Sequence, residues 1–232
     1  MPTASSRCFA LVPCAGVGVR AGGQGPKQYQ RIAGRPVVAH TLAALTAVAR
    51  IEATLVVLAP ADDAFERHLP DFAGRRCWLA RCGGATRAES VSSGLGTLVE
   101  RGVHANDWVL VHDAARCLVR PEWVDALIDA CLGDAVGGLL ALPLADTLKT
   151  EQDGRVGATI DRHAKWLAQT PQMFRLGALR DALAQAGAAI TDEAGAMELA
   201  GLAPKLVPGA LENFKVTFAA DFALAERLLK GR

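Results

Sequence analysis

The sequence carries little net charge and few aromatic residues, and each shortage excludes a class of function. Lys and Arg number 25 and Asp and Glu number 24 among 232 residues, which leaves a formal net charge of +1. A chain so close to neutrality has no long-range field to attract nucleic acid or an acidic membrane surface. Aromatic residues make up 5% of the chain and do not alternate with basic residues, as they do in single-strand binding surfaces. We therefore expect small-molecule substrates, no nucleic acid and no membrane.

Long apolar runs and paired cysteines are also missing. Every apolar run falls far short of a membrane span, and the run after Arg7 is too short for a secretory signal. None of the six cysteines forms a C-x-x-C pair. Free thiols in a reducing compartment are expected instead of disulfides or zinc ligands. The sequence therefore predicts a cytoplasmic protein.

Glycine, by contrast, is concentrated directly after the first apolar run. Residues 9–12 predict a buried strand, and the loop that follows contains Gly16, Gly18, Gly22, Gly23 and Gly25. Arg20 and Lys27 lie in the same loop. Glycine lets backbone N–H groups converge on a ligand, and fixed cations stabilise negative charge. The loop predicts a polyphosphate site, although an ordinary glycine-rich turn with solvated basic residues fits the loop alone equally well.

The same loop contains a partial match to the G-x-G-x-x-G/A dinucleotide fingerprint, at Gly16, Gly18 and Ala21. That fingerprint leads straight into a helix and is followed about 20 residues later by an acidic residue. Here residues 22–26 block a helix start, and residues 33–40 contain no acidic side chain. The pattern argues against a nicotinamide cofactor, and an NAD-dependent oxidoreductase is kept only as an alternative.

Apolar periodicity predicts strands that alternate with helices over residues 9–142. The expected strands are 51–58, 77–82, 108–112 and 136–142, and the expected helices are 36–48, 61–68, 86–101 and 121–132. Thr86 and Glu89 form a capping-box pattern. Such alternation is typical of an α/β fold with a mostly parallel sheet and helices on both faces. Three motifs, the glycine loop, Gly83 with Gly84, and residues 113–116, each follow a strand, where such folds bind ligands.

Residues 143–170 interrupt this alternation with a polar stretch that predicts an extended arm of two strands. Beyond it, the pattern predicts helices at 176–186, 192–199 and 219–229 and short strands at 205–207 and 214–216. No internal repeat, low-complexity tract or linker divides the chain. We expect residues 1–232 to form a single domain that carries the arm.

Several short motifs occur in an order and spacing that match one family. They are Pro13 to Arg20, Pro26 to Gln28, Gly84 to Ser90, His112 to Arg116, Asp161 with Arg162, Thr170 to Gln172, Thr191 to Ala194, and Asn213 to Thr217. Together they resemble the 2-C-methyl-D-erythritol 4-phosphate cytidylyltransferases of the non-mevalonate isoprenoid pathway, from about residue 8 to residue 230. Many sugar nucleotidyltransferases share the glycine loop, whereas the combination of motifs is much more specific.

The resemblance implies a Rossmann-like fold of the nucleotide-diphospho-sugar transferase type with an extended β-arm. It implies transfer of CMP from CTP to methylerythritol phosphate with Mg²⁺ or another divalent cation, in a homodimer joined through the arm at 143–170. The acceptor phosphate is already anionic at neutral pH, so its oxygen needs no strong general base. Positioning and neutralisation of charge remain, and cations are therefore the expected catalytic residues.

By matching position, the resemblance gives catalytic roles to four cations, Arg20, Lys27, Arg162 and Lys215. The first two would stabilise the transition state on the triphosphate, and the other two would hold the acceptor. The implied acceptor site comprises Arg116, Thr147, Arg162, Thr170, Thr191, Asp192 and Lys215. In this family the arm embraces a second subunit, so Arg162, Thr147 and Thr170 would act across the dimer interface. Thr191 fits equally well as the N-cap of the next helix.

The implied nucleotide site comprises Pro13, Cys14, Ala15, Gly16, Gly18, Gly84, Ala85, Arg87, Ser90, Asp113 and Ala114. Asp113 is also the one residue assigned to the metal, which would be held mostly by the CTP phosphates. The chain departs from the family pattern at Cys14, Ala85, Cys117 and Phe214. None of these departures removes a cation.

Two further alternatives stay open. A cytidylyltransferase for another polyol phosphate, such as ribitol 5-phosphate, would share the CTP half of the site, and Arg162 with the segment 191–194 favours methylerythritol phosphate. A non-catalytic nucleotide-binding subunit would be expected to lack Arg20, Lys27 or Lys215, and all three are present.

Overall fold

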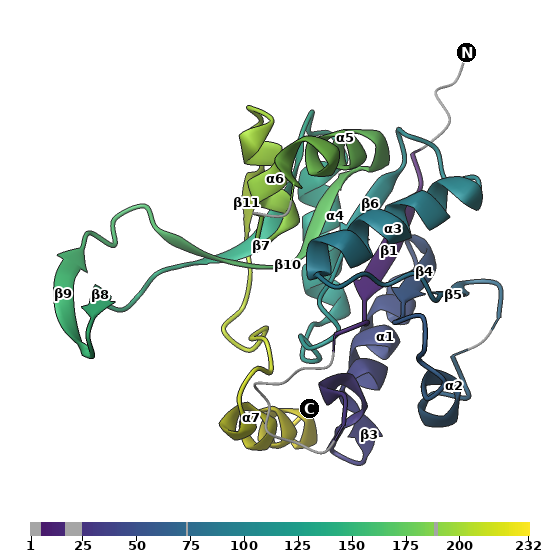
Figure 1. Cartoon of the computed structure of the whole chain (residues 1–232), viewed down its shortest axis with the longest axis horizontal. Helices are drawn as coiled ribbons and strands as arrows, with labels where there is room; N and C mark the ends of the chain where they lie inside the picture. The colour runs from purple at the N-terminus through teal and green to yellow at the C-terminus, as the bar shows by residue number, and fades with distance from the viewer. Residues whose placement is uncertain (1–5, 17–24, 73, 188–189) are drawn as a thin grey trace.

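The computed structural model describes residues 6–16, 25–72, 74–187 and 190–232. Its centre is a seven-stranded sheet in the order β11-β7-β10-β6-β1-β4-β5 (Figure 1). These strands are β1 (Cys8–Pro13), β4 (Ile51–Val57), β5 (Cys77–Ala80), β6 (Trp108–Val111), β7 (Gly137–Pro143), β10 (Trp166–Arg175) and β11 (Lys205–Pro208). The helices are α1 (Val37–Ala47), α2 (Phe65–His68), α3 (Arg87–Glu100), α4 (Pro121–Cys131), α5 (Leu176–Ala186), α6 (Glu193–Leu199) and α7 (Ala219–Lys230). None of the described helices is long and apolar enough to cross a membrane.

The sheet is mostly parallel, as the sequence predicts. Strand β1 pairs in parallel with β4 and β6, β4 with β5, and β11 with β7. Strand β10 is the exception, because it runs antiparallel between β6 and β7. The prediction that the arm ends near residue 170 missed this strand, since Gln169, Pro171 and Gln172 interrupt its apolar pattern.

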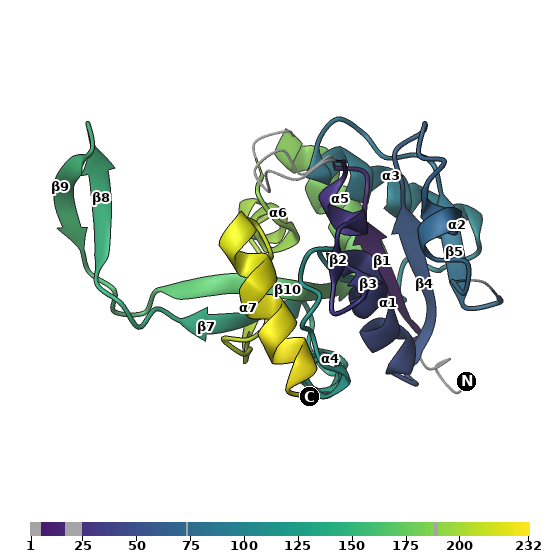
Figure 2. The same ribbon diagram turned by 90° about the horizontal axis from the view of Figure 1, so that it is seen from below.

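Alternate residues of the inner strands bury their side chains on opposite faces of the sheet. Ala10, Val12 and Leu110 belong to a core shared with α1 and α4. Leu11 and Val109 belong to a second core shared with α3, α5 and α6. Helices therefore cover both faces, as Figures 1 and 2 show, and burial on two sides accounts for the continuous apolar strands.

The arm projects from the sheet as an extension of the β7–β10 ladder (Figure 2). Its tip is the antiparallel pair β8 (Leu148–Gln152) and β9 (Arg155–Ile160). Every residue of these two strands is exposed, and the two strands form a separate sheet. The predicted two-stranded arm is confirmed.

Two predicted elements differ from the structure. Helix α2 begins at Phe65 and not at residue 61, because the Asp62 side chain accepts hydrogen bonds from the Ala64 and Phe65 amides. Residues 214–216 form no strand; the Val216 amide donates to the Ala115 carbonyl instead of a sheet edge. A short hairpin, β2 (Arg31–Ile32) with β3 (Arg35–Pro36), was not predicted at all.

The capping box at α3 forms only in part. The Thr86 hydroxyl accepts from the Glu89 amide at 3.1 Å, as predicted. The Glu89 carboxylate, however, accepts from the Ala85 amide at 2.8 Å. Its bond therefore closes the loop before the helix, one residue earlier than in a capping box.

Two glycines in α3 provide a matched test of its packing. A Cβ atom at Gly94 would lie 2.8 Å from Leu11 Cδ1 and 2.7 Å from Val57 Cγ2, both in the core, whereas one at Gly96 would meet nothing within 4 Å. We expect Gly94→Ala to lower the free energy of unfolding by about 1–2 kcal/mol. Gly96→Ala should raise it by about 0.5–1 kcal/mol through helix propensity. Urea unfolding of both variants checks this, and equal effects would contradict the close packing.

Candidate active site

A cavity of about 440 Å³ opens at the carboxyl ends of the parallel strands. Its walls come from the loop after β1, the loop between β5 and α3, and the loop after β6. It is lined by Pro13, Cys14, Ala15, Gly16, Lys27, Gln28, Gly84, Ala85, Thr86, Arg87, Ser90, Asp113, Ala114, Ala115 and Lys215. All the residues predicted for the nucleotide that the structure describes are therefore brought together. Gly18 and the predicted catalytic Arg20 lie outside the described residues.

Hydrogen bonds fix the backbone around this cavity. The Cys14 amide donates to the Val57 carbonyl at 2.8 Å, and the buried Gln28 side chain donates to the Cys14 carbonyl at 3.0 Å. The Ser90 hydroxyl accepts from the Gly84 amide at 3.1 Å and donates to the Thr86 carbonyl at 2.9 Å. Ser90 thus shapes the loop before α3, and Gln28 is a supporting residue that the sequence analysis missed.

The two loops approach so closely that one position requires glycine. A Cβ atom at Gly83 would lie 2.3 Å from the Ala15 Cβ and 2.8 Å from the Leu58 carbonyl oxygen. Backbone atoms cannot move aside as a flexible side chain can. Because the two loops lie so close together, their main-chain atoms form one wall of the cavity.

A second cavity of about 250 Å³ adjoins the first. It is lined by Arg87, Asp113, Arg116, Ala168, Gln169, Thr170, Gln172, Thr191, Asp192 and Lys215. Five predicted acceptor residues lie here, and the other two, Thr147 and Arg162, lie on the arm. The two cavities share Arg87, Asp113 and Lys215, so these three residues form the wall between them.

The dividing wall is a network of ion pairs centred on Asp113. Arg87 Nε lies 2.8 Å from Asp113 Oδ1, and Lys215 Nζ lies 3.0 Å from Oδ2. Arg116 Nε lies 3.6 Å from the same Oδ2. Burial alone would raise the pKa of Asp113, but Arg87, Lys215 and Arg116 outweigh it and hold that pKa well below its ordinary value. Asp113 is therefore ionised at neutral pH.

A buried carboxylate holds the other side of Arg87. Glu193 Oε1 accepts from Arg87 Nη1 at 2.6 Å, and Oε2 accepts from Nη2 at 3.0 Å. Glu193 is the first residue of α6, after the N-cap Asp192. The N-cap is thus Asp192 and not Thr191, which corrects the alternative interpretation of Thr191. No role was predicted for Glu193, because its partner lies 106 residues away.

His112, the residue before Asp113, is hydrogen-bonded to two residues that line the second cavity. Its Nδ1 lies 3.1 Å from Thr170 Oγ1, and its Nε2 lies 3.2 Å from the Arg116 carbonyl. Thr170 Oγ1 also accepts from the Asp113 amide, so we infer that the Thr170 hydroxyl donates its own hydrogen to His112 Nδ1. The ring N–H of His112 is then on Nε2 and donates to the Arg116 carbonyl. Burial lowers the pKa of His112 to about 4. The neutral ring therefore connects the loop after β6 to β10.

The remaining cation, Lys27, extends from the 3-10 turn at Lys27–Tyr29. Its Nζ donates to the Val216 carbonyl at 2.7 Å. This bond places Lys27 beside the segment that carries Lys215, at the first cavity. Two lysines distant in sequence therefore lie on one side of that cavity.

Asp113 does not fit a metal held by the protein alone. Both of its oxygens face cations, at 2.8 Å and 3.0 Å. Across the described ranges, no group of three or more His, Cys, Asp or Glu side chains could hold a metal ion. A divalent cation at this site would have to bring most of its ligands with it, as Mg²⁺ does with a triphosphate.

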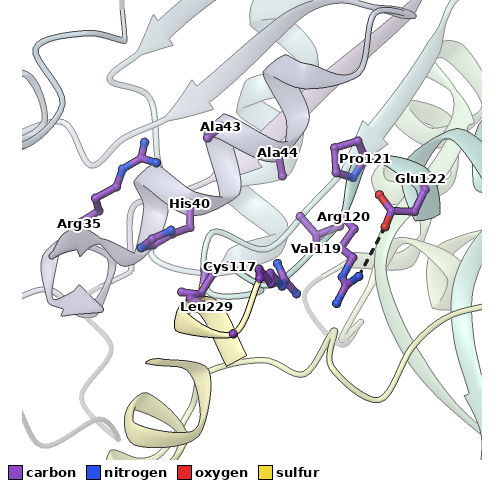
Figure 3. Close-up of a pocket in the computed structure, with 12 residues that line it drawn as sticks. Arg35, His40, Ala43, Ala44, Cys117, Val119, Arg120, Pro121, Glu122 and Leu229 are labelled. Atoms are coloured by element: carbon purple, nitrogen blue, oxygen red, sulfur yellow. Dashed lines mark ion pairs between the residues drawn. The ribbon is translucent and has the colours of Figure 1, made fainter. Parts of the chain in front are cut away.

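Another cavity, of about 490 Å³, lies between α1, the start of α4 and the chain's last residues (Figure 3). Arg35 and His40 line one side, and Arg120 and Glu122 line the other. Arg120 pairs with Glu212 at 2.7 Å and with Glu122 at 3.8 Å. Its charge is thus compensated, and none of the predicted site residues that the structure describes lines this cavity. We assign no chemistry to it.

A mostly parallel α/β sheet, a glycine-bounded cavity at its carboxyl edge and a cationic second cavity together define the class of nucleotidyltransferases. A family model described as 2-C-methyl-D-erythritol 4-phosphate cytidylyltransferase matches residues 8–231. The chain belongs to this family. The resemblance inferred from the motifs is confirmed, and none of the alternatives is favoured.

Relatives and solved structures agree with this family. A 2-C-methyl-D-erythritol 4-phosphate cytidylyltransferase from Paraburkholderia phymatum is 51% identical over 231 residues, which cover 97% of both chains. A bifunctional enzyme IspD/IspF from Albidiferax ferrireducens is 63% identical over 228 residues, and this chain spans 54% of its length. A crystal structure of a 4-diphosphocytidyl-2C-methyl-D-erythritol synthase matches with a TM-score of 0.87 and 38% identity, covering 97% of this chain and 99% of the other.

The low pKa of His112 predicts a specific loss of stability in acid. The folded chain keeps the ring neutral down to about pH 4, whereas the unfolded chain protonates it near the ordinary value of 6.5. Acidification from pH 6.5 to pH 4 should therefore lower the free energy of unfolding by on the order of 3 kcal/mol through this group. Urea unfolding across this window measures it. The variant His112→Gln should lack this component, and parallel curves for the two proteins would contradict the assignment.

Proposed function

We propose that this protein transfers CMP from CTP to the phosphate of 2-C-methyl-D-erythritol 4-phosphate and releases pyrophosphate. The family match supports the reaction. The observation that carries it to this site is the wall of Arg87, Asp113 and Lys215 between two adjoining cavities. CTP would occupy the larger cavity and the acceptor phosphate the smaller one.

In this proposal an oxygen of the acceptor phosphate attacks the α-phosphorus of CTP. A new P–O bond forms, the bond to the bridging oxygen breaks, and pyrophosphate leaves with the electron pair. The attacking oxygen is already ionised, so the protein has to position two anions against their repulsion. Lys27 at the nucleotide cavity and Lys215 in the wall supply fixed positive charge, and Arg20 is proposed to join them on the triphosphate.

We include Mg²⁺ in the proposal as the magnesium complex of CTP. The metal would add charge neutralisation on the triphosphate, with its ligands drawn from phosphates and water. Asp113 would add little to this coordination, because both of its oxygens already face cations.

Lys27→Ala should lower kcat for pyrophosphate release by on the order of 10²-fold, since one charge-assisted contact to the transition state is lost. Pyrophosphate release is measured from CTP and Mg²⁺ with methylerythritol phosphate or ribitol 5-phosphate as separate acceptors. Lys230→Ala, which removes an exposed lysine from α7, serves as the matched control and should keep full activity. Release with ribitol 5-phosphate alone would overturn the proposed acceptor, and release with neither acceptor would overturn the reaction.

We further propose that the arm at 143–170 joins two copies of the chain. Large apolar side chains are exposed along it, including Val156 at 67%, Leu167 at 51% and Trp166 at 40%. A second copy would cover these side chains. The exposed Arg162, which donates to the Ala145 carbonyl, would then reach the partner's acceptor cavity.

Mixing two inactive variants tests whether Arg162 acts on the partner. If it does, a heterodimer of Lys27→Ala and Arg162→Ala subunits contains one site with both side chains intact. Co-refolded equal amounts should then regain about a quarter of wild-type activity, because half of the random dimers are mixed. Arg155→Ala, on the same arm, should show no such defect by itself. Absence of recovery in mixed dimers would place Arg162 in its own subunit's site.

We also propose that residues 1–232 act as one catalytic domain in the cytoplasm. All six cysteines are free, which suits a reducing compartment. Burial raises the pKa of Cys117 to about 11 and of Cys131 to about 12, so these thiols stay protonated.

A further inference from the structure

Glu193 is a buried carboxylate that the proposed reaction does not use. Its side chain is 1% exposed, and its partner among the described residues is Arg87. Burying such a pair is costly, and well-packed apolar residues often serve stability equally well. The pair is therefore better explained by its effect on the geometry of the site than by a contribution to stability.

The pair determines how Arg87 meets Asp113. A guanidinium presents its donors in a rigid planar fork. Glu193 accepts one hydrogen bond from each Nη group, at 2.6 Å and 3.0 Å, and so fixes the orientation in which Nε donates to Asp113 Oδ1 at 2.8 Å. Arg87 therefore binds one oxygen of Asp113 and not both.

The other oxygen of Asp113 holds Lys215. Lys215 Nζ lies 3.0 Å from Oδ2. Because 37% of the Lys215 side chain is exposed, the position of its ammonium group is determined by this ion pair and by the backbone on either side. Arg116 lies farther from the same oxygen, at 3.6 Å. The position of Lys215 in the wall thus depends on Oδ2 staying clear of Arg87.

We propose that Glu193 is a positioning residue that restrains Arg87 to one oxygen of Asp113 and so reserves the second oxygen for Lys215. The inference rests on the proposed function, in which Lys215 faces the acceptor phosphate. Glu193 acts from the far side of Arg87 and lines neither cavity.

Charge and geometry make opposite predictions for Glu193→Gln. The network contains three cations, Arg87, Arg116 and Lys215, and two carboxylates, Asp113 and Glu193. Neutralising Glu193 adds net positive charge, which by itself would strengthen the binding of anionic substrates. The same change releases the guanidinium of Arg87, which can then turn and donate to both Asp113 oxygens in a bidentate pair. Lys215 is then displaced, so turnover falls although CTP binding does not.

The experiment compares Glu193→Gln with Glu198→Gln, an equal change of charge at an exposed position of the same helix. Steady-state pyrophosphate release gives kcat and KM, titration calorimetry gives the Kd of CTP alone, and thermal unfolding monitors the fold. For Glu193→Gln we expect kcat to fall on the order of 10- to 100-fold. The Kd and KM of CTP should stay within about 3-fold or fall. For Glu198→Gln we expect all values to stay within about 2-fold of wild type.

Two kinetic results for Glu193→Gln would overturn the proposal. One is unchanged kcat in a folded Glu193→Gln variant. The other is a fall in kcat matched by an equal loss of CTP affinity, which would mean a damaged nucleotide site. If Glu193→Gln does not fold, Glu193→Asp draws the carboxylate back by one methylene and breaks the bidentate link to Arg87 while keeping the charge. It should show the same loss of kcat, and wild-type kcat in that variant would equally refute the proposal.

A crystal structure of Glu193→Gln, or of Glu193→Asp in its place, separates this inference from the proposed function. Lys215 Nζ should have left hydrogen-bond distance of Asp113 Oδ2, whatever the acceptor is. Displaced Lys215 in a protein whose wild type is inactive on methylerythritol phosphate would refute the proposed function and retain the inference. Lys215 found at its wild-type distance would refute the inference alone.

Discussion

The ionised carboxylate of Asp113 is the constraint on which the site depends. It is nearly inaccessible to water, and a carboxylate in such a place is stable only when cations and hydrogen-bond donors surround it. Arg87 comes from the start of α3, Arg116 from the loop after β6, and Lys215 from the segment before α7. Satisfying one negative charge therefore requires three parts of the chain to meet at the carboxyl edge of the sheet.

The same requirement links the site to the arm. Strand β10 changes register against β7 between Ala168 and Gln172. Within that break, Thr170 accepts from the Asp113 amide, and Gln172, where the pairing with β7 resumes, binds Asp192 and the Ala194 amide. The strand that leaves the sheet as the arm thus also supplies the floor of the smaller cavity. The base of the arm is therefore linked to Asp113 directly, through the hydrogen bond from the Asp113 amide to Thr170.

Much of the fold and part of the site were predictable from the sequence, for one physical reason. Parallel strands end at one edge, so motifs that follow them must converge, and the residues predicted for the nucleotide that the structure describes do line one cavity. What was missed depends on partners far apart in the chain. Glu193 and Gln28 are polar residues whose burial follows from tertiary contacts and not from a periodic pattern. Strand β10 was missed because its polar residues serve the site instead of the core.

The segment before α7 has neither helix nor strand, yet it carries Lys215. Asn213, which is fully buried, donates to the Gln169 side chain and to the Thr170 carbonyl, while its own carbonyl accepts from Arg116. Two residues beyond Lys215, the Thr217 amide donates to Asp221 of α7. These hydrogen bonds on both sides of Lys215 hold the irregular backbone of the segment against the sheet and α7. The backbone at Lys215 is therefore already ordered, and under the proposed function binding of the acceptor phosphate would cost mainly the side-chain entropy of the lysine.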